Sequence, residues 1–116
     1  MGAVTLHIEG WDVEVDEAGG GRVGAFAIAE RAGLKRQKDV KELLERNRSE
    51  LEQHGPLPMR RTVRRIEKRG AIGGVELREV DEPMLNEAQA YNLAILMRTP
   101  RASALRVSLL KLFLAV

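Results

Sequence analysis

The sequence predicts an α+β domain in which two β-hairpins alternate with two pairs of helices. Near the N-terminus, and again beyond residue 60, apolar and polar residues alternate as they do in half-buried strands. After each of these stretches, apolar residues recur at helical spacing, and segments rich in glycine or proline separate the two patterns. With 116 residues, 44% of them hydrophobic, the chain is long enough for one domain with a buried core.

Residues 1–23 are predicted to form a hairpin and a glycine-rich connection. Residues 4–8 alternate apolar with polar side chains, and Trp11, Val13 and Val15 alternate with acids in the same way. The pair Glu9-Gly10 between them suits a tight turn. We expect Trp11 to lie in the core, and residues 18–21 to act as a flexible connection.

Residues 24–55 have the outline of a helix-turn-helix. An alanine-rich helix over 24–32 is followed by Gly33, a typical helix C-cap. A second helix is predicted from about residue 37 to 53, with Val40 and Leu44 on its apolar face and Lys38 and Lys41 opposite. Two short helices joined through a glycine, the second one basic, are typical of a helix-turn-helix. Helical hairpins that bind nothing share this outline.

Residues 56–82 are predicted to form a basic hairpin, or wing. Two prolines and a glycine in residues 54–58 end the preceding helix. Six bases then follow within ten residues: Arg60, Arg61, Arg64, Arg65, Lys68 and Arg69. A glycine-rich turn over 70–74 leads into a second strand, which we expect to pack on the core. Helix remains an alternative for residues 62–68, because arginine, glutamate and lysine all favour it.

Residues 83–116 are predicted to form two packing helices. Asn86 can cap the first, and Thr99 with Pro100 can start the second. We interpret both as core or dimer-interface helices, because apolar residues recur along them at helical spacing. The predicted homodimer interface consists of Leu105, Leu109, Leu112 and Phe113. An apolar C-terminal end predicts burial against a partner copy, or a chain that continues beyond Val116.

Composition argues against several classes of protein. The chain has no cysteine, which excludes disulfides and thiol catalysis and suits a cytosolic location. No apolar run approaches the roughly 20 residues of a membrane span. His7 and His54 lack metal-ligand spacing and have no orienting carboxylate nearby in the sequence, and residues 19–21 lack the lysine of a phosphate-binding loop. We therefore expect no enzyme activity, metal or cofactor.

Charge is arranged in blocks, although the formal net charge is only +2. Residues 1–30 carry six acids and one base, whereas residues 35–69 carry twelve bases and six acids. Acids return in residues 76–87, and residues 98–116 carry four bases and no acid. This pattern predicts a basic face for a polyanion and an acidic face elsewhere. With the order of the predicted elements, the expected fold is a winged helix-turn-helix-like domain. Solvated surface charge is the alternative for any single block.

Two sets of residues match a known pattern. The first is Ile28, Ala29, Gly33 and Val40 in the helix-turn-helix segment. The second and more specific set is Leu85, Gln89, Leu93, Leu96, Arg98, Thr99 and Ala102. Over roughly residues 24–116 the chain therefore resembles the phage regulatory protein Rha and related phage antirepressor-type N-terminal domains. It departs from them at Gln37, where members often have histidine, and it lacks the longer C-terminal region of many members.

The resemblance implies a non-enzymatic phage or prophage regulator that binds double-stranded DNA as a homodimer in the bacterial cytoplasm. The resemblance does not decide whether the protein acts as a repressor or as an antirepressor. The N-terminal part of the second helix would reach base edges, with Arg36 suited to guanine and Gln37 to adenine. The predicted contacts there are Lys35, Arg36, Gln37, Lys38 and Lys41, and the bases of residues 60–69 would contact phosphates. The alternative is a phage-encoded inhibitor whose charged surface binds a host protein or nucleoprotein complex.

Overall fold

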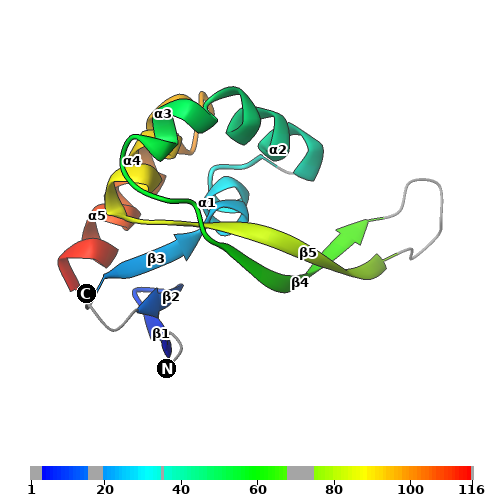
Figure 1. Cartoon of the computed structure of the whole chain (residues 1–116), viewed down its shortest axis with the longest axis horizontal. Helices are drawn as coiled ribbons and strands as arrows, with labels where there is room; N and C mark the ends of the chain where they lie inside the picture. The colour runs from blue at the N-terminus through cyan, green and yellow to red at the C-terminus, as the bar shows by residue number, and fades with distance from the viewer. Residues whose placement is uncertain (1–3, 16–19, 35, 68–74, 116) are drawn as a thin grey trace.

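The computed structural model describes residues 4–15, 20–34, 36–67 and 75–115, with the backbone alone at residues 37, 65–67 and 75–76. The described part of the chain is an α+β fold, as predicted (Figure 1). Its strands are β1 (Val4–Ile8), β2 (Trp11–Val15), β3 (Gly21–Gly24), β4 (Met59–Glu67) and β5 (Val75–Leu85). Its helices are α1 (Ala25–Arg31), α2 (Gln37–Arg46), α3 (Arg48–Glu52), α4 (Glu87–Leu96) and α5 (Ala102–Ala115). The strands form one antiparallel sheet in the order β1-β2-β3-β5-β4.

The N-terminal hairpin is confirmed, but the connection after it is not purely flexible. Strand β1 pairs with β2, and Glu9 and Gly10 turn the chain with positive φ angles. Residues 21–24, expected as the end of a connection and the start of a helix, instead form β3. This strand pairs with β2 on one side and with β5 on the other. It therefore joins the two predicted hairpins into a single sheet.

The helix-turn-helix segment contains the expected helices, with one change. Gly33 follows α1 with a φ of 89°, a left-handed conformation that favours glycine and ends the helix. The predicted helix over 37–53 is divided at Asn47 into α2 and α3. The Asn47 side chain donates a hydrogen bond to the carbonyl of Leu43, four residues earlier. A polar side chain bonded back to its own helix competes with regular helical geometry, which explains the break.

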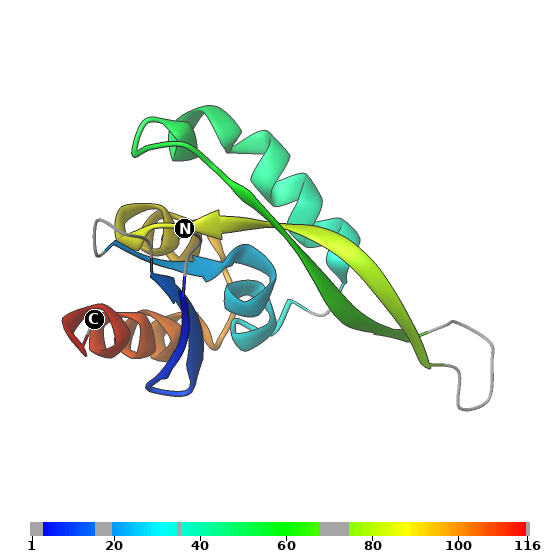
Figure 2. The same ribbon diagram turned by 60° about the horizontal axis from the view of Figure 1, so that its bottom comes forward.

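The basic segment is a strand over residues 62–67, so the helical alternative is wrong there, and residue 68 lies outside the described residues. Strand β4 pairs with β5 from Met59 opposite Pro83 to Glu67 opposite Val75. The hairpin projects beyond the helices, which gather on one side of the sheet in Figure 1. Figure 2 shows the same projecting hairpin from another side. The second strand packs on the core through half-buried Val80 and buried residues 82–85, whereas residues 77–79 are exposed.

The two C-terminal helices are present, but only the first starts as predicted. The Asn86 side chain accepts a hydrogen bond from the backbone N–H of Gln89, whose side chain accepts one from the Asn86 N–H, so the two form a capping box. Thr99 does not cap α5, which begins at Ala102. The Thr99 hydroxyl instead donates a hydrogen bond to the carbonyl of Ala32, just after α1. The joint between α4 and α5 is thus tied to the end of α1.

The core lies between the sheet and helices α1, α4 and α5. Trp11 is buried as expected, and its indole N–H donates a 3.0 Å hydrogen bond to the Ser108 hydroxyl of α5. The Arg31 guanidinium lies 3.7 Å from the centre of the Trp11 ring on another side. These contacts hold the N-terminal hairpin to both α1 and α5. Within the described residues, no helix has the length and apolar character that crossing a membrane requires.

Candidate nucleic-acid interface

The N-terminal end of α2 presents basic side chains to solvent. Arg36 precedes the helix, Lys38 and Lys41 lie on it, and all three are exposed. No acid of the described chain lies within ion-pair distance of them. Val40 and Leu44 hold the opposite face of α2 against the core. In Figures 1 and 2 this end of α2 lies on the same side of the molecule as the projecting hairpin.

The arginines of β4 have a different environment. Arg64 contacts Glu82 of β5 at 2.9 Å and Glu30 of α1 at 2.8 Å. Arg60 lies 3.6 Å from Glu82 and 3.6 Å from Glu14 of β2. The Arg64 and Arg60 side chains are 22% and 30% exposed, so both are largely enclosed. The structure thus places both predicted phosphate contacts in a network of ion pairs within the chain.

The buried carboxylate of Glu82 organises this network. One of its oxygens accepts hydrogen bonds from the backbone N–H groups of Phe26 and Ala27 at 2.9 and 3.1 Å, and from Arg64. Those N–H groups open α1, and no side chain of the Gly24 N-cap is available to bond them. A carboxylate at this point also complements the partial positive charge of the helix N-terminus. Glu82 therefore caps α1 from a distant strand.

Gly24 provides the space that this carboxylate occupies. A Cβ atom placed on Gly24 would lie 2.2 Å from the nearer Glu82 oxygen, well inside contact distance. The φ angle of Gly24 is −72°, which any residue adopts, so glycine is needed here for its small size. The close approach of β3 to β5 depends on it.

Arg61 lies on the solvent side of the hairpin and is also paired. It contacts Asp81 at 3.3 Å and Glu79 at 3.4 Å, both on the facing strand. The antiparallel register places Arg60 opposite Glu82 and Arg61 opposite Asp81, so acids of β5 oppose bases of β4. The expectation that the bases of residues 60–64 are free to contact phosphates is therefore corrected. Lys35, Lys68 and Arg69, and the side chains of Gln37 and Arg65, lie outside the described residues.

The predicted dimer interface is corrected as well. Leu105, Leu109 and Leu112 are buried in the chain's own core, where α5 packs beside α4. Phe113 is half-buried and meets the ring of Tyr91 edge-on, with 5.8 Å between the ring centres. Of the two interpretations of α5, core is confirmed for these residues. A homodimer stays a prediction, and its interface would have to lie elsewhere.

Most residues that carry the family resemblance have structural roles. Ile28, Ala29 and Val40 are buried. The Gln89 side chain, fully buried on α4, donates hydrogen bonds to the carbonyls of Leu51, Gly55 and Pro56, at 2.9–3.2 Å. This amide anchors the turn between α3 and β4. The second motif therefore describes how α4 holds its neighbours.

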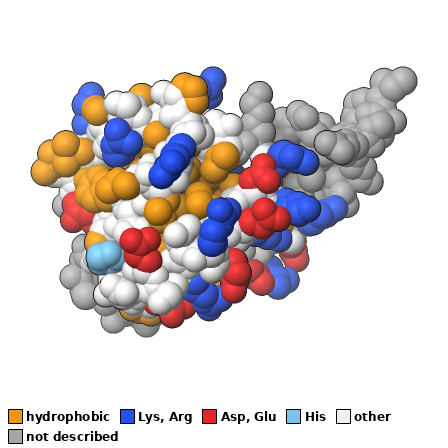
Figure 3. All heavy atoms as spheres, turned by 90° about the horizontal axis from the view of Figure 1, so that it is seen from above, with side chains coloured by type: hydrophobic (Ala, Val, Ile, Leu, Met, Phe, Trp, Pro, Cys, Tyr) orange, Lys and Arg blue, Asp and Glu red, His pale blue; other side chains and the backbone are white. Residues whose placement is uncertain are grey.

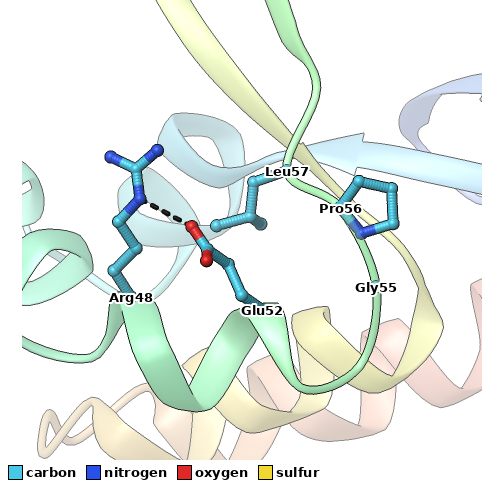
Figure 4. A pocket seen from close by; sticks show the side chains of 5 residues that line it. All are labelled: Arg48, Glu52, Gly55, Pro56 and Leu57. Atoms are coloured by element: carbon cyan, nitrogen blue, oxygen red, sulfur yellow. Dashed lines mark hydrogen bonds and ion pairs between the residues drawn. The ribbon is translucent and has the colours of Figure 1, made fainter.

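Two further features could suggest a small-molecule site. A shallow pocket of about 340 Å³ lies between α3 and the segment that follows it (Figure 4). Its charged groups, Arg48 and Glu52, already bond each other at 2.7 Å. Across β1 and β2, His7 contacts Asp12, a carboxylate partner that the sequence did not indicate because it arises from strand register. The side chains of His7 and Asp12 are well exposed, and the pocket at α3 is open to solvent. Neither feature therefore forms an enclosed site.

Comparisons of the chain with protein-family models, with curated proteins and with solved structures give no match.

Proposed function

We propose that this protein is a DNA-binding regulator of the phage type, built as a winged helix-turn-helix in which α1 and α2 are the two helices and the β4–β5 hairpin is the wing. The observation that carries the proposal is the set of exposed bases at the N-terminal end of α2. Arg36, Lys38 and Lys41 have no acidic partner among the described residues. Residues at this end of the second helix reach base edges in helix-turn-helix proteins.

The arrangement around α2 supports this use. The turn after α1 is held by Gly33 and by a hydrogen bond from the Leu34 N–H to the Ala29 carbonyl, at 3.0 Å. Val40 anchors α2 to the core, so its basic side faces outward. A rigidly held helix loses little conformational freedom on binding, which favours affinity. The hairpin on the same side supplies a second surface next to a duplex.

The decisive measurement is fluorescence anisotropy of a labelled random-sequence duplex, titrated with the protein across salt. We expect binding that weakens steeply between about 50 and 200 mM salt. The triple variant Arg36→Gln/Lys38→Gln/Lys41→Gln should bind more weakly. On a random-sequence duplex these three bases would contact phosphates rather than chosen base edges. The dependence of log K on log salt should therefore be shallower by about 3 in the triple variant, because each lost phosphate contact removes roughly one unit.

Arg61→Gln is the matched control, because Arg61 is also an exposed base but contacts Glu79 and Asp81. It should leave affinity and salt slope close to those of the parent. Absence of duplex binding at low salt would overturn the proposal and favour a protein target. If the triple variant and Arg61→Gln lose equal affinity for the duplex, α2 is not the contact surface.

A further inference from the structure

Helix α5 is apolar on two opposite faces. Leu105, Leu109 and Leu112 face the core. Val107, Leu110 and Leu114, at positions i, i+3 and i+7, form a second stripe and are 52%, 50% and 77% exposed. Among the described residues, nothing covers this second stripe.

Helix α4, which packs beside α5, also has an exposed apolar side chain. Phe113 meets Tyr91 of α4, and Ile95, one turn further along α4, is 66% exposed. We call Val107, Leu110 and Leu114 the outer face. Figure 3 shows hydrophobic side chains gathered at the end of the molecule where α3, α4 and α5 lie, with lysine and arginine side chains between them. Exposed apolar side chains grouped in this way mark interaction surfaces.

The charges beside the outer face have one sign along α5. Arg106 and Lys111 flank the stripe on either side, and both are exposed. No acid occurs between residues 98 and 116. Glu87, in the first turn of α4, lies near Tyr91. An apolar stripe with a base on either side complements an apolar stripe flanked by acids.

We propose that the outer face binds an acidic amphipathic helix of a partner protein. Leucine-sized side chains of the partner would lie against Val107, Leu110 and Leu114, and its flanking carboxylates would pair with Arg106 and Lys111. Helices recognise one another in this way in coiled-coil zippers, through a few apolar anchors that recur at helical spacing. A second copy of α5 fits less well, because it would bring Arg106 and Lys111 against their own like charges.

The probe is a synthetic helical peptide with leucines at i, i+3 and i+7 and glutamates beside them. A second peptide has the same composition in scrambled order. Amide chemical shifts of the full chain are followed during each titration. We expect the ordered peptide alone to shift signals at residues 107–114, and Leu110→Glu to weaken its binding by about tenfold or more. Lys111→Glu should weaken it less, and added salt should weaken it in the parent.

Leu77→Glu is the control, because Leu77 is 70% exposed but lies on the hairpin. It should leave peptide binding unchanged. Equal binding of both peptides, or shifts away from the outer face, would overturn the proposal. A dimer seen in sedimentation equilibrium would also overturn the proposal if Leu110→Glu dissociates it. The same holds for binding to phosphatidylglycerol vesicles that requires Leu110. Duplex binding measured on Leu110→Glu separates this proposal from the proposed function, because α2 is untouched.

Discussion

Strand β4 and the N-terminal end of α2 both carry clustered bases, yet the structure treats them differently. Arg60, Arg61 and Arg64 each contact carboxylates of the same chain. Lys38 and Lys41 face solvent with no such contact among the described residues. The local density of positive charge is higher in β4, but the charge available to a partner is higher on α2. A basic segment therefore indicates a polyanion site only where nothing in the fold already neutralises it.

The difference arises from register. Residues 60–64 look strongly basic along the chain, and the acids that balance them lie about twenty positions further on. Antiparallel pairing brings Asp81 and Glu82 directly opposite Arg61 and Arg60. On α2 the neighbouring acids of the helix itself do not reach the lysines. The following three sets of variants test this contrast between bases that are paired within the chain and bases that are available to a partner.

The largest expected effect is at Glu82. Replacing it in Glu82→Gln removes the buried charge that Arg60 and Arg64 share, and should lower the free energy of unfolding by about 3 kcal/mol, since one partner of a buried ion pair is lost. Urea denaturation measures this value. Glu79→Gln is the control, because Glu79 pairs with Arg61 in solvent and should change stability little. A similar loss in both variants would contradict the distinction between buried and exposed pairs.

The next effect is at Gly24. Gly24→Ala places a methyl group where the Glu82 carboxylate lies, so we expect a loss of about 2 kcal/mol in the free energy of unfolding from overpacking. The loss should be smaller in a Glu82→Ala background, because the two positions are in contact. Independent, additive losses in this double-mutant cycle would show that the carboxylate does not occupy that space.

The smallest expected effects come from two single variants. One replaces a base that is paired within the chain, and the other replaces an exposed base of α2. Arg64→Gln removes charge-assisted hydrogen bonds to Glu82 and Glu30, and should reduce stability by about 1.5 kcal/mol. Lys41→Gln should leave the urea midpoint unchanged but weaken duplex binding. Thermal or urea unfolding, together with anisotropy, measures both variants. Stability loss in Lys41→Gln, or none in Arg64→Gln, would reverse the assignment of structural and available bases.

Local patterns were sufficient for most of the fold. Alternation predicted the N-terminal hairpin, glycine predicted the turn at Gly33, and Asn86 predicted the start of α4, because each of these features depends on neighbouring residues. Strand β3 was missed, since four residues with two glycines show no alternation. The break at Asn47 was missed because its neighbours continue the helical pattern.

The features that join distant segments of the chain could be found only in the tertiary structure. Periodicity identified α5, but could not say which of its two apolar faces turns inward, because both have helical spacing. Composition identified the bases of β4, but not that Glu82 of β5 neutralises two of them and caps α1. A hydrogen bond or ion pair between residues far apart in the chain leaves no local pattern. The sequence alone therefore established most of the elements and their order, and folding decided which charges and which apolar face remain for a partner.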